Sequence, residues 1–285
     1  MFEPPFRWDL TQRSRLGSLV EGECAGTFPG FEGQLLPCCS RVLAFAGDSD
    51  LVFVGRSPES LFDHLSGLLF DTSWFERLTL LHFSIRFREE EEIRAEHPQA
   101  VPAIRTYLKQ LALDPEGLAT RPRPVALVDL VATGDTFGRL IRLLFRWSQE
   151  ARLDWSATRR RLRLVGLTRR EKTSPNTWRW HQHAPWMSLL ERGTVANVSI
   201  SRELYRYIGD DQPKVSRSYA PEVWGAPALA APSYEEKQLQ ALRLAYRLFE
   251  GGRTKERRER FVSCLVKEPA MQEGWFRGLV REVRG

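Results

Sequence analysis

The stretch VALVDLVATGDT at residues 125–136 constrains the fold of this chain more than any other part of its sequence. Four apolar residues lead into Asp129, a tight turn follows over residues 132–136, and a strongly helical stretch covers residues 137–152. A strand, turn and helix in this order aim backbone N–H groups and threonine hydroxyls at one point, behind which lies the positive end of the helix dipole. We therefore expect a phosphate-binding loop, with Gly134 allowing the backbone to approach the anion closely.

This order of apolar strand, acid, two apolar residues and Ala-Thr-Gly-x-Thr resembles the phosphoribosyl-diphosphate signature of type I phosphoribosyltransferases, in its adenine-type form. The loop residues that the resemblance assigns to the 5′-phosphate are Ala132, Thr133, Gly134, Asp135 and Thr136. It also implies that Asp129 holds the ribose hydroxyls, directly or through Mg²⁺. The strand of that family usually ends in two adjacent acids, and here Val128 stands in the first of these positions.

A second strand–loop–helix unit lies earlier in the chain, where this family places its pyrophosphate-binding loop. The resemblance implies that Arg56 pairs with diphosphate oxygens through its planar guanidinium and that Ser57 adds a further donor. Ser57 also fits the N-cap of the following helix, with Pro58 at the first helical position. An ordinary capped helix with a surface arginine is the other interpretation.

Two further segments are candidates for catalysis and for acceptor binding. Members of the adenine-type group carry a mobile loop with an acid that protonates or orients the base, and Glu89 begins an acidic run at the matching place. A solvated run of like charges is the alternative. Trp178 and Trp180 are candidates to stack on a nucleobase within the variable hood of the family. A structural loop with buried tryptophans is the competing interpretation.

The remaining pattern predicts an α/β protein. The expected strands are 51–54, 78–87, 125–129, 161–167 and a short one at 194–199. The expected helices are 34–46, 58–70 and 102–113, with a loop over 114–124. Strands separated by helices indicate an open, mostly parallel sheet with helices on both faces, and such sheets bind ligands at the carboxyl ends of their strands. His64 in a helix and His82 in a strand are interpreted as packed core histidines.

Domain boundaries follow from composition. Residues 1–225 form the predicted phosphoribosyltransferase-like domain, with the hood at about 170–225, and residues 226–232 (APALAAP) resemble a linker. Residues 233–285 are expected to form a helical appendage that packs on the main domain or mediates self-association as a homodimer. Ser233 begins a capping-box pattern there, and Gly251-Gly252 is expected to end the first helix.

Composition narrows the cellular context. The 285 residues contain 42% hydrophobic residues but no apolar run long enough to span a membrane. The four cysteines include the vicinal pair Cys38 and Cys39, and they show no metal-ligand spacing, so we expect reduced thiols in the cytoplasm. The net charge of +6 suits phosphorylated small molecules or a nucleic acid, although solvated helix faces explain it equally well.

Three functions fit these patterns. The first is a Mg²⁺-dependent glycosyltransferase that uses phosphoribosyl diphosphate and a nucleobase-like acceptor and releases pyrophosphate. The alternative is a regulator that senses phosphoribosyl diphosphate or a nucleoside monophosphate without turnover, with a basic surface for a partner or a nucleic acid. Val128 in place of an acid favours this alternative. The third is transfer or hydrolysis of a different ribose phosphate, with water as acceptor.

Overall fold

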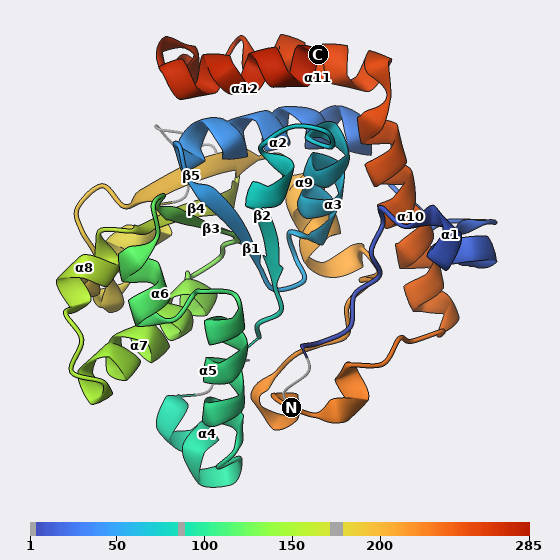
Figure 1. Cartoon of the computed structure of the whole chain (residues 1–285). Helices are drawn as coiled ribbons and strands as arrows, with labels where there is room; N and C mark the ends of the chain where they lie inside the picture. The colour runs from blue at the N-terminus through green and yellow to red at the C-terminus, as the bar shows by residue number, and fades with distance from the viewer. Residues whose placement is uncertain (1–3, 85–88, 172–178) are drawn as a thin grey trace.

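The computed structural model describes residues 4–84, 89–171 and 179–285. At its centre, five parallel strands form one open sheet in the order β2-β1-β3-β4-β5 (Figure 1). The strands are β1 Asp50–Val54, β2 Leu78–Leu81, β3 Val125–Leu130, β4 Leu162–Arg169 and β5 Val195–Ile200. The predicted open parallel α/β sheet is therefore confirmed.

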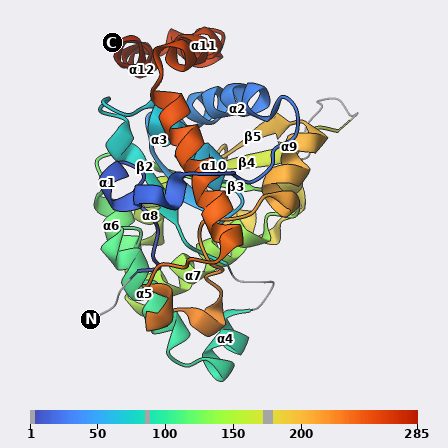
Figure 2. The same cartoon turned by 90° about the vertical axis from the view of Figure 1, so that its right-hand side faces the viewer.

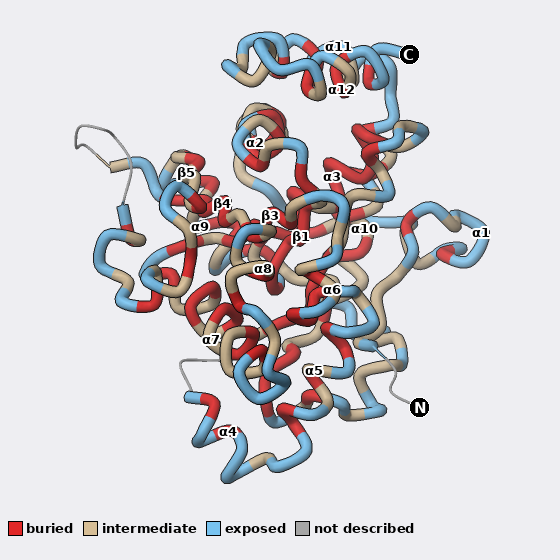
Figure 3. Tube along the Cα trace, turned by 60° about the vertical axis from the view of Figure 1, so that its left-hand side comes forward, coloured by how far each residue is buried: buried red, intermediate tan, exposed pale blue. Residues whose placement is uncertain are grey.

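Helices cover both faces of this sheet, because successive strand side chains point to opposite faces. In β1, Leu51 and Phe53 join one apolar cluster, whereas Val52 and Val54 join another on the opposite side. The helices on the first face include α2 Phe31–Ala46, α3 Glu59–Leu68 and α9 Arg202–Arg206. Those on the second face include α5 Ala100–Gln110, α6 Pro115–Thr120 and α7 Asp135–Glu150. Figure 3 shows the buried segments gathered along the strands between these two layers.

The other elements connect or extend these layers. The remaining α-helices are α1 Arg13–Leu16, α4 Glu90–Glu96, α8 Trp155–Arg159, α10 Glu236–Arg253, α11 Lys255–Leu265 and α12 Gly274–Arg284. The short 3-10 helices are η1 Gly17–Val20, η2 Phe75–Arg77, η3 Trp180–His183, η4 Pro185–Leu189, η6 Pro221–Val223, η7 Pro227–Leu229 and η8 Pro269–Gln272, and η5 Tyr207–Asp211 is a π-helical turn. None of the helices in the described ranges combines the length and apolar character needed to cross a membrane.

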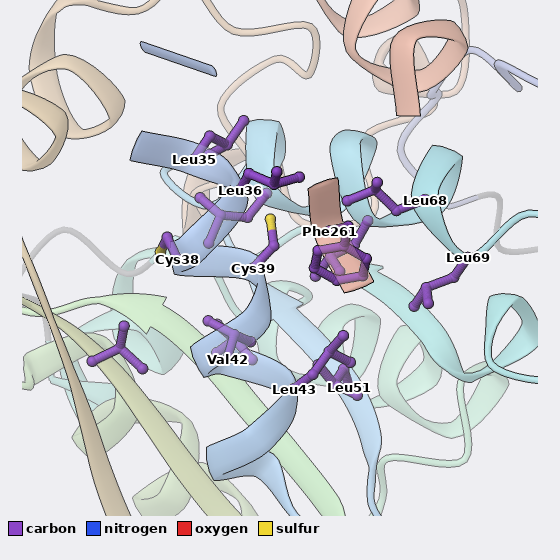
Figure 4. Close-up of a cluster of buried hydrophobic side chains, with 14 of the residues drawn as sticks. Leu35, Leu36, Cys38, Cys39, Val42, Leu43, Leu51, Leu68, Leu69 and Phe261 are labelled. Carbon is purple, nitrogen blue, oxygen red and sulfur yellow. The ribbon is translucent and has the colours of Figure 1, made fainter. Parts of the chain in front are cut away.

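The three C-terminal helices bury apolar side chains in the same core as the sheet. Helix α10 runs along α3, and α11 and α12 lie over α2 (Figures 1 and 2). Leu244 and Leu248 of α10 and Phe261 of α11 belong to the cluster that contains Leu51 of β1. Figure 4 shows Phe261 between Leu43 of α2 and Leu68 at the end of α3. The last fifty residues are thus packed on α2 and α3, the helices that cover the first face of the sheet.

Two predicted elements differ from the structure. Residues 114–124 were expected to be a loop, but they contain α6, because the Asp114 carboxylate caps the Gly117 N–H at 3.3 Å and Pro115 fits the first turn. The strand expected over 78–87 ends at Leu81. Its segment 82–84 leaves the sheet, and residues 85–88 lie outside the described ranges.

Two predicted helix caps are also wrong. Ser57 does not cap α3, which begins at Glu59 after Pro58 without a side-chain cap. Ser233 does not cap α10, because the helix begins at Glu236 and the Ser233 hydroxyl donates to Gln238 Oε1 at 2.8 Å. Helix α10 also continues through Gly251 and ends at Arg253. Each error shifts a helix boundary by no more than a few residues.

Candidate functional site

A cavity of about 560 Å³ opens at the carboxyl ends of β1, β2 and β3. In the sheet, β2 lies on one side of β1 and β3 lies on the other. The connection that leaves β1 and the connection that leaves β3 therefore run in opposite directions, and they diverge between these two strands. Open α/β sheets place their ligands at such a divergence. The lining residues that carry polar or charged side chains include Arg56, Ser57, His82, Asp129, Asp135, Thr136, Asp210, Gln212, Lys214, Arg217 and Lys237.

The loop between β3 and α7 brings one wall of the cavity into position. Asp135 and Thr136, the first residues of α7, line the cavity directly. The first N–H groups of a helix have no partner within it, so this end of α7 offers donors and a positive dipole to an anion. Thr133 is exposed on the turn beside the cavity, and its hydroxyl donates to Asp135 Oδ2 at 2.5 Å. The predicted phosphate loop and the cavity therefore adjoin each other.

Gly134 is required for a reason that the sequence did not reveal. Its φ of +85° lies in the left-handed region, and a Cβ there would lie 2.3 Å from the Trp180 ring. Trp180 itself is only 1% exposed, its Nε1 donates to Asn197 Oδ1 at 2.9 Å, and its ring stacks on Trp186. The prediction that Trp180 stacks on a nucleobase is thus wrong, because its ring supports the loop from below. Trp178 lies outside the described residues.

Asp129 ends β3 at the floor of the cavity. Its side chain is 5% exposed, and Oδ1 accepts a hydrogen bond from the Leu130 N–H at 2.7 Å. Burial raises the pKa of this carboxyl to about 8, although hydrogen bonds from Leu130 N–H and the Thr136 hydroxyl favour the ionised form. The neighbouring Val128 is completely buried on the α2 and α3 side of the sheet. Strand β3 therefore presents one carboxyl group to the cavity.

The loop after β1 forms the second wall. Gly55 has φ +74°, and a Cβ there would lie 3.0 Å from the Phe83 carbonyl oxygen, so the loops after β1 and β2 approach closely. Arg56 is exposed and Ser57 partly exposed, and both line the cavity. The structure thus brings Arg56 and Ser57 of one predicted loop and Asp135 and Thr136 of the other to one cavity, whereas Ala132, Thr133 and Gly134 are outside its lining.

A third wall, formed by residues 209–217, was missed in the sequence. Lys214 lines the cavity, and its Nζ donates to the Ile208 carbonyl at 2.5 Å. Burial lowers the pKa of Lys214 to about 8, while the nearby Glu59 carboxylate acts in the opposite direction. No local motif marks this segment, which reaches the cavity only because the chain returns to the carboxyl end of the sheet after β5.

Buried charges fix the third wall to α3. Glu59 accepts hydrogen bonds from the N–H groups of Val215 and Ser216 at 3.1 and 3.3 Å. Arg7, from the N-terminal segment, pairs with Asp63 at 2.5 Å and with Glu59 at 3.5 Å. Carboxylates that are removed from water need such partners. The N-terminal segment therefore helps to shape the cavity from outside it.

Glu89 does not reach the cavity. It caps α4, where its side chain accepts from the Glu92 N–H, and its carboxylate forms an ion pair with Arg139 of α7. It is absent from the cavity lining, where the structure places no residue of α4. The prediction of Glu89 as a catalytic acid is thus wrong, because its carboxylate pairs with Arg139 and the acidic run forms a helix that contributes no residue to the cavity lining.

The cavity offers a limited set of metal ligands. Within the three described ranges, no group of three or more Asp, Glu, His or Cys side chains is arranged to hold a metal ion. A Mg²⁺ ion that arrives with a diphosphate takes most of its ligands from phosphate and water and needs only one or two protein carboxylates. Asp129 fits that reduced role in its ionised form.

Comparisons of this chain with protein-family models, with curated proteins and with solved structures found no match. The chemistry of the cavity therefore carries the functional interpretation.

Proposed function

We propose that this protein binds a phosphorylated ribose, either phosphoribosyl diphosphate or a nucleoside monophosphate, in the cavity at the carboxyl edge of the sheet. One observation carries the proposal: the loop after β1 and the residues on either side of the β3–α7 turn (the end of β3 and the start of α7) line the same cavity at the point where the connections diverge. The cavity volume of about 560 Å³ lies within the range typical of small-molecule sites.

The lining residues suggest a role for each part of such a ligand. The 5′-phosphate would accept hydrogen bonds from the N–H groups at the start of α7 and from the Thr136 hydroxyl. A diphosphate would pair with the guanidinium of Arg56 and accept from Ser57. The ribose hydroxyls would lie against Asp129, between the two loops.

The reaction that suits this arrangement is phosphoribosyl transfer with Mg²⁺, in which a nucleobase-like acceptor displaces pyrophosphate. The oxocarbenium-like carbon needs anions placed around it, and positioning supplies most of the catalysis. In this proposal Asp129 is the carboxylate that faces the sugar. Binding of Mg²⁺ beside it would favour its ionised form.

A regulator that binds the same ligand without turnover is the second candidate. Three observations favour it: Val128 is buried in the core, Glu89 lies away from the cavity, and burial keeps the pKa of Asp129 near 8. The two candidates share the ligand and differ in whether pyrophosphate is released.

Calorimetric titration separates these possibilities. Phosphoribosyl diphosphate with Mg²⁺, ribose 5-phosphate and AMP are titrated into the protein, and pyrophosphate release is then measured with a panel of nucleobases. Micromolar binding with release supports the transferase, and binding without release with any base supports the regulator. If none of the three ligands binds, the proposed function is wrong.

Two variants test the site assignment. Arg56→Ala is expected to weaken phosphoribosyl diphosphate by about 1.5–3 kcal/mol, because a charged hydrogen-bonding partner is lost. It should leave ribose 5-phosphate nearly unchanged, since that ligand lacks the diphosphate. The control is Arg192→Ala. Arg192 is an exposed arginine that precedes β5, at the opposite edge of the sheet. Equal affinities for phosphoribosyl diphosphate in both variants and the parent would remove Arg56 from the site.

A further inference from the structure

His82 differs from an ordinary packed histidine in its position. It follows the last residue of β2, at the same edge of the sheet as Arg56 and Asp129, and it lines the cavity with them. Its side chain is nevertheless 95% enclosed, since only 5% of the residue is exposed. The imidazole is therefore held by the protein at the margin of the cavity.

One ring nitrogen of His82 lacks a protein partner. Among the described residues, Nδ1 is completely buried and has no hydrogen-bond partner. The backbone is held in place, because the Tyr107 hydroxyl accepts from the His82 N–H at 3.3 Å. Tyr107 in turn packs edge-on against Tyr219, another residue of the cavity lining. A buried polar atom without a partner costs free energy, and such atoms gather at sites where a ligand or water completes the bonding.

The charge state of the ring limits what it can bind. Burial, together with the charge of Arg7, lowers the pKa of His82 to about 3, so the ring is neutral at physiological pH. A neutral imidazole has one donor and one acceptor nitrogen and offers no positive charge to a phosphate. A hydroxyl group, which also donates and accepts, matches it better than an anion does.

We propose that His82 is a ligand-contacting residue that exchanges a hydrogen bond with a hydroxyl group of the bound sugar. This inference rests on the proposed sugar-phosphate site and adds the residue that distinguishes the sugar from the phosphate. The anion is bound by the start of α7 and by Arg56, whereas the imidazole and Asp129 contact the hydroxyl-bearing ring between them.

The test compares ribose 5-phosphate with inorganic phosphate in the parent and in His82→Phe, which keeps an aromatic ring but has no nitrogen. We expect ribose 5-phosphate to bind about tenfold more weakly in the variant, the loss of one hydrogen bond. Inorganic phosphate, followed by NMR titration, should bind with the same affinity as in the parent. Thermal unfolding verifies the fold, and His82→Leu, which also lacks a hydrogen-bonding group, replaces the variant if His82→Phe is unfolded.

His64→Phe is the matched control. His64 is also buried and also has one ring nitrogen without a partner, but it lies in the contact between α3 and α10, where its Nδ1 is 3.1 Å from the Leu248 carbonyl oxygen. It does not line the cavity. Its replacement should leave both affinities unchanged, although the protein should unfold at a lower temperature.

The outcomes separate the inference from the proposed function. Unchanged affinity of His82→Phe for ribose 5-phosphate overturns the role of His82 and leaves the sugar-phosphate site standing. Equal weakening of both ligands also overturns it, because the side chain would then act through the shape of the cavity. A parent protein that binds none of ribose 5-phosphate, phosphoribosyl diphosphate and AMP contradicts the proposed function itself, and the inference with it.

Discussion

Asp129 is the residue whose ionisation most affects both stability and the candidate site. Its carboxyl is buried, and its pKa in the folded protein is about 8, above the ordinary value of 3.8. Between these two values the folded protein binds more protons than the unfolded chain does. The stabilisation that Asp129 contributes is therefore complete below pH 4 and is lost as the pH rises through 8.

This linkage makes a prediction for Asp129→Asn, which keeps the shape of the side chain and removes its ionisation. We expect the free energy of unfolding of the variant minus that of the parent to be about 2–4 kcal/mol larger at pH 9 than at pH 5, so the variant gains stability relative to the parent as the pH rises. Urea denaturation at both pH values measures it. Asp48→Asn, which removes a carboxylate on the surface beside Arg77, is the control. A pH-independent difference for Asp129→Asn would show that its carboxyl ionises normally.

At the scale of elements, the contact between α3 and α10 depends on two glycines. A Cβ at Gly67 would lie 2.0 Å from the Phe249 carbonyl oxygen, and one at Gly252 would lie 2.8 Å from the Leu68 nitrogen. The helices therefore touch backbone to backbone, an approach that any larger side chain prevents. This contact places α10 against α3, whose N-terminal end carries Glu59 and the third wall of the cavity.

Gly67→Ala is accordingly expected to destabilise the protein by about 1–3 kcal/mol or more, because a methyl group is forced into a filled contact. Gly251→Ala is the matched control, since it lies in α10 and its Cβ would meet nothing within 4 Å. Alanine favours a helix over glycine, so this control should gain up to about 1 kcal/mol. Chemical denaturation compares the two, and a similar change in both variants would show that the helices separate without cost.

At the scale of the whole molecule, the apolar core joins distant parts of the chain. The cluster on the first face of the sheet combines strands β1, β3 and β4 with α2 and α3 and with residues of α10, α11 and α12. Helices that share one core with a sheet are expected to unfold together with it.

Phe261→Ala tests this cooperativity. Phe261 is fully buried between α11, α2 and α3, so its truncation should cost about 3–5 kcal/mol. The melting temperature of the entire protein should fall in one transition, measured by calorimetry and by tryptophan fluorescence together. A separate early transition confined to the C-terminal helices would instead identify them as an independent appendage.

The sequence by itself determined the class of the fold and the position of the two loops. The strand–turn–helix unit that begins at residues 125–136 can be predicted from neighbouring residues alone, because the apolar strand, the turn glycine and the amphipathic helix are each short-range signals. Parallel strands then place their carboxyl ends at one edge, so Asp129 and Arg56 were expected near one another without knowledge of any contact. The sequence did not determine the helix boundaries, since neither Ser57 nor Ser233 caps its helix.

Tertiary structure alone decided which side chains serve the cavity. Of three residues singled out in the sequence, two pack or pair elsewhere and one lines the cavity. Trp180 is buried under Gly134 and Glu89 pairs with Arg139, whereas His82 lines the cavity. The third wall around Lys214 is held by Arg7 and Glu59, which lie far from it in the sequence. Local sequence patterns indicate the conformation of neighbouring residues. Which side chains are buried, and which of them meet at the cavity, depends on contacts between distant segments that form only in the folded chain.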